Sequence, residues 1–409
     1  MSNLAIPHDR VVLLTGVTGS LGSELLPRLL RRFPNHGILA LIRSRNGDAT
    51  DRLDEVMRFA GLSIQDRLRV GAIPGDTTLP NLGLSAKDLK VMAARTSAVF
   101  HTAASVAFDR SLAEMRAANV VGTREILGFA RRAAQIHGDF RLHYVSTAYV
   151  VGDRRGLLRE SELDCGQGFW NSYEQSKMES ERLVMQAMGD APATIYRPSH
   201  IIGNVKTGKI RRFFGIYGFI RLAHRLIKYG NLDKAPKFLI ADPDTRGDMV
   251  PCDYVCDAMV ALAGRDDTVG GTYHLTAGLD ASLPISKVVE ITAEIFESAL
   301  PDKAIPRPPI FKSDIYQSRI DRSELRIYQS SAAKLLMGVY LPYLSYERDF
   351  DVRATKFLLA LSGVFLPPIE DVLRDSIRYA IRQGFGDYAA ESEPLEALPS
   401  LPIGQGRVR

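Results

Sequence analysis

The first half of the chain alternates short apolar, β-branched runs with longer amphipathic segments, and this alternation limits the fold more than any other feature. We predict strands at residues 10–16, 38–43, 67–73, 98–103, 141–147 and 193–199. We predict helices between them at about 21–33, 48–60, 85–94, 110–135 and 171–188. Strict alternation of this kind is typical of a parallel, doubly wound sheet with helices on both faces. The strand runs are continuously apolar, which indicates a sheet buried on both sides.

After Gly203 the alternation stops, and this gives the expected domain boundaries. The predicted parts are an α/β core at 1–203, a basic and aromatic insertion at 204–246, a return to the core at 247–283, a mostly helical region at 284–386 and a tail at 387–409. The return contains a turn and helix at 247–264 and a strand at 271–276. The tail is rich in Gly, Pro, Ser, Glu and Ala, a composition typical of disorder. The expected fold class is α/β with a smaller, mostly helical region.

Composition excludes several classes of protein. The 409 residues are 45% hydrophobic and 24% charged, ordinary values for a soluble globular protein. A net charge of +5 is a mild excess that suits anionic small molecules or acidic carrier proteins, and we expect no nucleic-acid partner. The three cysteines, Cys165, Cys252 and Cys256, form no CxxC pair, so we expect neither a disulfide framework nor a metal site.

Neither a leader nor a membrane span is expected. The N-terminus, "MSNLAIPHDRVVLLTG", has no cationic segment ahead of an apolar one, so no signal peptide is predicted. The longest apolar runs, such as 356–369, contain Gly and Pro and are too short to cross a bilayer. With no disulfides expected, these features favour a cytoplasmic protein, in a reducing compartment, attached to a membrane at most peripherally.

A glycine-rich turn follows the first predicted strand. Residues 15–22 read "TGVTGSLG" and open a helix. In a dinucleotide site, one glycine permits the tight turn, one lets backbone N–H groups approach the pyrophosphate, and one lets helix and strand pack closely. The pyrophosphate then sits at the positive end of the helix. The turn therefore predicts cofactor contacts from Gly16, Thr18, Gly19, Ser20, Leu21 and Gly22.

The second strand ends without the acid that an NAD site usually carries. Its end reads "ALIRSRN", with Arg43 and Arg45 in place of a carboxylate and no acid before Asp48. A guanidinium there would pair with a 2′-phosphate, whereas a carboxylate would repel it. NADP(H) is therefore favoured over NAD(H). The alternative is that both arginines are solvated loop charges.

Residues 173–177 read "YEQSK", which places Tyr173 and Lys177 one helical turn apart on a shared face. A free tyrosine has a pKa of about 10, too high for efficient proton transfer at neutral pH. A nearby ammonium would stabilise the phenolate and lower that pKa. By itself the pair can equally be two solvated residues on a helix surface.

Together these motifs resemble the extended short-chain dehydrogenase/reductases, which have a Rossmann-like doubly wound sheet and a smaller substrate-binding region. The match covers residues 10 to about 280 in the family's order and spacing. The stretches that carry it are "TGVTGSLG" (15–22), "GD" (75–76), "HTAA" (101–104), "NVVGT" (119–123), "VSTAYVVG" (145–152), "YEQSK" (173–177), "YRPSHIIG" (196–203) and "VPCDYVCDAM" (250–259).

The resemblance implies a catalytic role for Tyr173 together with Thr147, Lys177 and Asn119. Lys177 would also hydrogen-bond the nicotinamide ribose, and Asn119 would support the site through the backbone and water. Thr147 would hold the substrate oxygen, since it lies at the family's position, five residues before Gly152. Ser146 is then expected to point to the opposite face of the strand.

Further cofactor contacts are implied at lower specificity: Asp76, Thr77, Ala103, Ala104, Pro198 and His200. Asp76 would receive the adenine amino group, and the two alanines would let the chain pass close to the ribose. His101 and His200 are also acid–base candidates, although a lone histidine beside a strand end is more often structural.

A narrower resemblance, to the thioester reductases and the male sterility type of fatty acyl-CoA reductase, is carried by residues 74–85, 100–109, 145–150 and 197–210, with a weaker match at 340–351. It implies NADPH-dependent reduction of an acyl thioester to an aldehyde, with further reduction to an alcohol as an option. Thr147 and Tyr173 would stabilise the oxyanion. The acyl group is expected to arrive in trans on CoA or an acyl-carrier protein.

The segment 209–230 carries six basic residues and no acid among aromatic and aliphatic side chains. It could line an acyl tunnel, with its basic face meeting CoA phosphates, an acidic carrier protein or an anionic membrane surface. The alternative is a helix that closes over the core with its arginines in water.

Three other functions compete. A ketone reductase would use the same tyrosine, lysine and NADPH. A nucleotide-sugar epimerase or dehydratase retains tightly held NAD, which Arg43 disfavours. A non-catalytic NADP-binding regulator would typically lack the Tyr–Lys pair.

Overall fold

The computed structural model describes residues 8–44, 47–230, 239–312 and 341–386. Its centre is a seven-stranded sheet in the order β12-β7-β5-β4-β1-β2-β3, with every neighbouring pair parallel. The strands are β1 (Val11–Thr15), β2 (Gly37–Ile42), β3 (Val70–Pro74), β4 (Thr96–His101), β5 (Arg141–Val145), β7 (Ala193–Pro198) and β12 (Thr272–Leu275). All seven coincide with predicted strands, so the doubly wound α/β fold is confirmed.

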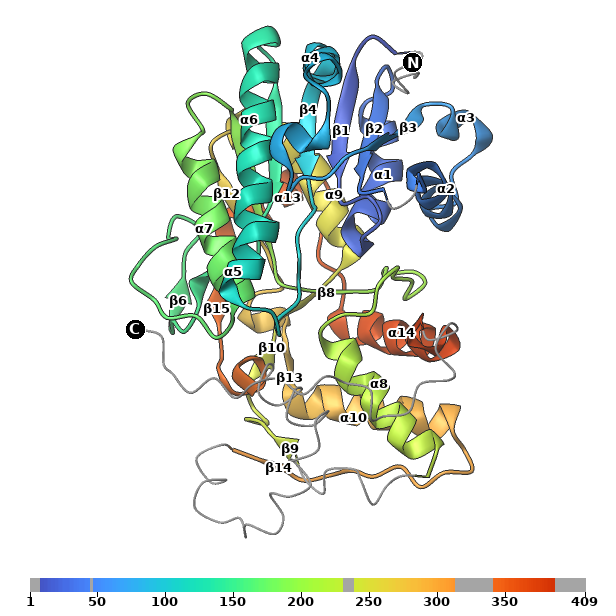
Figure 1. Ribbon diagram of the computed structural model, residues 1–409. Helices are drawn as coiled ribbons and strands as arrows, with labels where there is room; N and C mark the ends of the chain where they lie inside the picture. Colours follow the sequence, from blue (N-terminus) through green and yellow to red (C-terminus); the bar gives the residue numbers. More distant parts are fainter. Residues whose placement is uncertain (1–7, 45–46, 231–238, 313–340, 387–409) are drawn as a thin grey trace.

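Helices cover both faces of this sheet (Figure 1). They are α1 (Ser20–Arg32), α2 (Ala49–Phe59), α4 (Ala86–Arg95), α6 (Val121–Ile136), α7 (Ser172–Gln186) and α9 (Cys252–Ala263), with a short α3 (Ile64–Arg67). Val12 and Leu14 of β1 pack into the hydrophobic cluster with α1, α2 and α9. Val11 and Leu13 pack into the cluster with α4, α6 and α7. Both faces of β1 are therefore buried, which explains its uninterrupted apolar sequence.

The predicted helix at 110–135 is not continuous. The structure divides it into α5 (Leu112–Met115), a π-helical turn (Arg116–Val120) and α6. The π turn carries Asn119, whose side chain accepts from the N–H of Ser105 (2.8 Å) and donates to the hydroxyl of Ser176 (3.0 Å). Apolar periodicity does not reveal such a turn, which is common at functional sites.

A second group of elements, here called the covering region, lies beyond the carboxyl edge of the sheet (Figure 1). Its helices are α8 (Ile216–Lys228), α10 (Ile285–Ala299) and α14 (Ile369–Arg382). Its strands are the pairs β8 (His200–Ile202) with β11 (Met249–Pro251), β10 (Arg246–Gly247) with β13 (Leu283–Pro284), β9 (Leu239–Ile240) with β14 (Ile310–Phe311) and β6 (Leu157–Leu158) with β15 (Asp349–Phe350). The helix that precedes α14 in the chain, α13 (Arg353–Leu361), packs back against the sheet domain beside α9 and β12.

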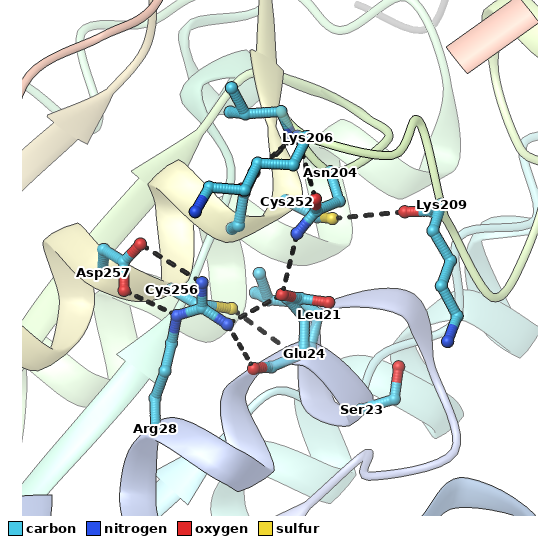
Figure 2. A network of polar contacts seen from close by, with 12 residues as sticks. Leu21, Ser23, Glu24, Arg28, Asn204, Lys206, Lys209, Cys252, Cys256 and Asp257 are labelled. Atoms are coloured by element: carbon cyan, nitrogen blue, oxygen red, sulfur yellow. Dashed lines mark hydrogen bonds and ion pairs between the residues drawn. The ribbon is translucent and has the colours of Figure 1, made fainter. Parts of the chain in front are cut away.

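Polar contacts tie α1 to α9 and to the turn after β8 (Figure 2). Arg28 donates to Glu24 at 2.7 Å and to Asp257 of α9 at 2.6 Å. Glu24 also accepts from the side-chain amide of Asn204 at 3.2 Å. This network fixes the first helix, and with it the glycine turn, against the start of the covering region.

One difference from the predicted boundaries lies in the return to the core. The segment expected as a turn and helix at 247–264 begins at the end of β10 and continues with the strand β11, which pairs with β8. Arg45 and the tail at 387–409 lie outside the described residues. Within the described ranges, no helix combines the length and apolarity needed to cross a bilayer.

Candidate active site

A cavity of about 280 Å³, here called the reaction cavity, opens where the central strands end and the covering region begins. Ligand sites of doubly wound sheets lie at this carboxyl edge. The predicted site residues in its wall are Gly16, Gly19, Ser20, Leu21, Gly22, Ala104, Thr147, Tyr173, Lys177, Pro198 and His200. A larger hollow of about 380 Å³ lies at the opposite edge, around Arg10 and His36, where a fold of this type places no site.

The glycine turn has the geometry that a pyrophosphate site requires. Gly16 has φ +73°, and a Cβ there would lie 2.6 Å from the backbone N of Ala103. A Cβ on Gly22 would lie 2.3 Å from the carbonyl oxygen of Gly16. Gly19 begins α1 with no side-chain cap, which leaves the first N–H groups of the helix available to an anion. The turn therefore fits a dinucleotide.

Thr147, Tyr173 and Lys177 meet at the wall of the same cavity. Thr147 Oγ1 donates to the carbonyl oxygen of Pro198 at 3.4 Å and lies close to the hydroxyl of Tyr173. Lys177, only 2% exposed, donates from Nζ to the hydroxyl of Tyr144 and to the carbonyl of Val145, both at 2.8 Å. The ammonium is thus held by the end of β5, one helical turn from the tyrosine.

The predicted lowering of the Tyr173 pKa is wrong for this arrangement. Burial raises the pKa of Tyr173 above its ordinary value, and the nearby hydroxyl of Thr147 only partly opposes this. Burial also lowers the pKa of Lys177 to about 7, although the charge of Glu181 opposes the change. Since burial disfavours the charged form of each group, Tyr173 is a neutral phenol that can donate a proton.

Asn119 is buried beside this group and does not line the cavity. Through Ser176 it contacts α7 one residue before Lys177, and through Ser105 it contacts the loop after β4. Its position is that of a support for α7.

His101 and His200 each make a hydrogen bond within the protein, as structural histidines do. His101 Nδ1 bonds the hydroxyl of Thr15 at 2.7 Å, and burial lowers its pKa to about 3. His200 Nε2 accepts from the N–H of Ile216 at 3.0 Å, and burial lowers its pKa to about 4. Both rings are therefore neutral imidazoles at neutral pH and not imidazolium ions, which argues against an acid role.

Ser146 differs from the prediction. It was expected on the opposite face from Thr147, but both line the reaction cavity. β5 ends at Val145, and Thr147 already caps the 3-10 turn Ala148–Val151, so strand alternation no longer applies. The Ser146 hydroxyl is buried and has no hydrogen-bond partner in the part of the chain that the structure describes.

The residues predicted to contact the adenosine end of the cofactor do not gather around one cavity as the catalytic residues do. Arg43 follows β2 with an exposed side chain. Asp76 Oδ1 accepts from the N–H and hydroxyl of Thr78 at 2.9 and 2.8 Å, so part of this carboxylate holds its own turn. Thr77 lies beside Gly122, where a Cβ would approach its hydroxyl to 3.3 Å. None of these residues lines the reaction cavity.

The basic segment 209–230 contacts the glycine turn, which sequence reasoning missed. Arg211 Nε donates to the carbonyl of Thr18 at 3.1 Å. The N–H of Arg212 donates to the hydroxyl of Ser20 at 3.0 Å, and that hydroxyl donates back to the carbonyl of Arg212 at 3.3 Å. The excess of arginine was the only local signal of this contact.

Comparison with known proteins agrees with this geometry. The sequence model of the family described as male sterility protein matches residues 14–259. The fatty acyl-CoA reductase wat of Drosophila melanogaster is 28% identical over 290 residues, which cover 62% of this chain and 54% of that protein. The glycine betaine reductase ATRR of Emericella nidulans is 30% identical over 286 residues, which cover 66% of this chain and 21% of that protein. The chain thus spans about half, or less, of the length of these curated relatives.

Among solved structures, the terminal R domain from the myxalamid PKS-NRPS biosynthetic pathway superposes with a TM-score of 0.74 and 28% identity, covering 92% of this chain and 91% of that one. A UDP-glucuronic acid 4-epimerase from Bacillus cereus, in complex with NAD, superposes with a TM-score of 0.61 at 17% identity, covering 91% and 99%. The second likeness shows the fold alone. The chain belongs to the male sterility protein family, within the thioester reductase group of the extended short-chain dehydrogenase/reductases.

Proposed function

We propose that the chain is an NADPH-dependent reductase that converts an acyl thioester to an aldehyde and a thiol. The observation that carries the proposal is the meeting of Thr147, Tyr173 and Lys177 with the glycine turn around one cavity. The named fatty acyl-CoA reductase among the relatives supports the thioester substrate.

The site residues have distinct roles in this reaction. The nicotinamide cofactor, when bound along the glycine turn, supplies the hydride. Thr147 and Tyr173 donate hydrogen bonds to the carbonyl oxygen of the thioester, where negative charge develops. Tyr173 can then pass its proton to that oxygen, since its raised pKa keeps it protonated. Lys177 holds the end of β5 and orients the tyrosine.

After hydride transfer, the thiol leaves and the aldehyde forms. When the tetrahedral adduct collapses, the carbon–sulfur bond breaks and the hydroxyl proton of the adduct returns to Tyr173. The departing thiolate takes up a proton from water and leaves as the thiol. One thioester, one NADPH and one proton give one aldehyde, one thiol and one NADP⁺.

The preference for NADPH is supported by the arginines around the end of β2. Arg43 is exposed there, and Arg52 donates to its carbonyl oxygen, which places a second guanidinium at the same turn. Arg211 reaches the neighbouring helix α2 through Glu55 at 3.3 Å. Such a cluster suits a 2′-phosphate better than a bare ribose.

We further propose that the acyl group arrives on CoA or on an acyl-carrier protein. The apolar side of α8 is buried through Ile220, Leu226 and Ile227, so it is used within the protein. Arg221 and Lys228 on the same helix are exposed. The remaining cationic surface suits CoA phosphates or an acidic carrier better than insertion into a bilayer.

The test is to follow the loss of NADPH absorbance with acyl-CoAs, ketones and UDP-sugars offered in turn, and to repeat the productive reaction with NADH. We expect turnover of acyl-CoAs, detectable free thiol, and lower kcat/KM with NADH. Turnover of ketones with no thioester consumed would instead identify a ketone reductase.

A further inference from the structure

A second cavity, of about 70 Å³, lies next to the reaction cavity and shares Tyr149 and His200 with its wall. Its other walls come from α8, from β10 and β11, and from residues 343–350. Most of the lining is aromatic or aliphatic. A cavity of this size holds a group of only a few heavy atoms, since one water molecule occupies ~30 Å³ in the liquid.

Arg348 is buried in this wall between two tyrosine rings. It is 7% exposed, and its Cζ lies 5.4 Å from the ring centre of Tyr149 and 5.0 Å from that of Tyr343. Its Nη1 donates to the carbonyl oxygens of Pro342 and Tyr346 at 3.4 and 3.3 Å. Its Nη2 is buried without a hydrogen-bond partner among the residues that the structure describes.

The nearby carboxyl groups are already engaged elsewhere. Asp248, in the same wall, accepts from the hydroxyl of Ser199 at 2.5 Å and from two backbone N–H groups after β12 at 2.9 Å. Glu174 accepts from the hydroxyl of Tyr343 at 2.5 Å. Burial raises the pKa of both carboxyl groups, although the charge of Arg348 partly opposes this at Glu174, so each is a weakened counter-charge for Arg348.

The charge of this wall is otherwise positive. The second arginine, Arg246, donates from Nη1 to the carbonyl of Ser282 at 2.7 Å. A buried donor that is left without an acceptor destabilises the folded protein, and more so when the donor is charged. An oxygen acceptor from outside the chain would remove this cost at Arg348.

We propose that the second cavity binds a carboxylate carried on the acyl chain of the substrate, with Arg348 Nη2 as its donor. This inference rests on the proposed function and narrows it to acyl thioesters that bear a distal carboxylate. Tyr149 and His200 line both cavities, so an acyl chain would extend from the reaction cavity into the second past these two side chains. Guanidinium–carboxylate pairs are strong and directional, and aromatic walls accommodate the methylene stem.

Matched substrates test this. Hexanoyl-CoA and adipyl-CoA, and octanoyl-CoA and suberyl-CoA, differ only in the distal carboxylate. We expect kcat/KM with NADPH, and affinity by calorimetry, to favour the dicarboxylic member at one or both lengths by about tenfold to a hundredfold, as charged hydrogen bonds do. Arg348→Met should remove this preference.

The matched control is Arg155→Met, because Arg155 lies 4.8 Å from the ring centre of Tyr346 but is exposed and lines neither cavity. This variant should keep the preference. If Arg348→Met fails to fold, competition by the monoamide of adipic acid against hexanamide in the natural protein gives the same answer, because only the first compound carries a carboxylate, and it is expected to bind more tightly.

The outcomes separate the two proposals. Equal affinity and equal kcat/KM for both members at both lengths, or a preference that survives Arg348→Met, overturns the carboxylate site. Absence of turnover with every thioester overturns the proposed function instead, while calorimetry still reports on the carboxylate.

Discussion

The sheet and the covering region are each stabilised by a different kind of contact. Every residue of β1 is wholly buried and pairs in register with strands on both sides. The covering region is held by strand pairs of two or three residues, by the packing of α8, α10 and α14 into a hydrophobic cluster, and by side-chain contacts such as the hydroxyl of Tyr343 on Glu174, 169 residues away. The sheet therefore follows from local sequence, whereas the cover depends on distant partners that must find one another.

The two ends of the proposed site divide along the same line. Tyr173 and Lys177 lie on α7 and are fixed against β5. Arg348 and Tyr343 belong to the covering region. We expect the first pair to determine whether the reaction occurs and the second to determine which substrate is used.

Removing one tyrosine hydroxyl from each end of the proposed site tests this division of roles and has the largest expected effect. Tyr173→Phe should lower kcat by about 10²–10⁴-fold, the usual contribution of a positioned proton donor, with NADPH affinity retained. Tyr343→Phe removes a hydroxyl that bonds Glu174 at 2.5 Å, and should change kcat less than tenfold. Steady-state kinetics and NADPH fluorescence titration measure both. Equal losses in the two variants would contradict the division.

The junction of the two regions gives the next largest effect. Arg197 of β7 and Glu181 of α7 form an ion pair at 2.5 Å in which both side chains are 0% exposed. Arg197 also donates to the carbonyls of Glu160 and Glu162, in the loop that follows β6. Arg197→Met leaves a buried carboxylate without its partner and should lower the free energy of unfolding by about 3–5 kcal/mol.

Its control is an exposed ion pair on the same helix. Arg182 bonds Asp164 at 2.8 Å with side chains 47% and 48% exposed, so Arg182→Met should cost at most ~1 kcal/mol. Urea denaturation compares the two variants, and similar losses would mean that the buried pair is not what joins the regions.

The sequence predicted the strands, the glycine turn and the Tyr–Lys pair because each depends on residues near one another in the chain. The strand predictions succeeded since a sheet buried on both faces requires unbroken apolar runs such as that of β1. The π turn at Asn119 was missed because one widened turn leaves the apolar period almost unchanged.

The errors at the site arose where local rules stop. Ser146 was assigned to the wrong face because β5 ends at Val145, two residues before the end of the predicted strand. The direction of the Tyr173 pKa depends on burial by segments that the motif does not contain. The sequence around Arg348 did not indicate a binding role, because its surroundings depend on the aromatic ring of Tyr149, which is remote in the chain, as well as on that of Tyr343.

The burial of Lys177 predicts how stability depends on pH. Its pKa is about 7 in the folded protein and lies near its ordinary, higher value when unfolded. At a pH between the folded and unfolded pKa values, Lys177 is protonated in the unfolded chain and neutral in the folded protein. The free energy of unfolding therefore rises with pH from about 7 upward, and below pH 7 the folded protein bears the full cost of burying the charged ammonium. The free energy of unfolding, relative to Lys177→Met, should therefore rise by a few kcal/mol from about pH 7 to 10. The control Lys90→Met removes an exposed lysine, and its free energy of unfolding should change with pH as that of the natural protein does.

The smallest expected effect concerns two glycines of the sheet domain. Gly16→Ala places a Cβ 2.6 Å from backbone at φ +73°, and should cost about 1–3 kcal/mol and weaken NADPH binding. Gly128→Ala, in α6 with nothing within 4 Å of its Cβ, should instead stabilise by ~0.5–1 kcal/mol. Thermal melts with and without NADPH distinguish them. If Gly16→Ala binds NADPH as tightly as Gly128→Ala, the cofactor does not lie along the glycine turn, and the site at the carboxyl edge must be assigned differently.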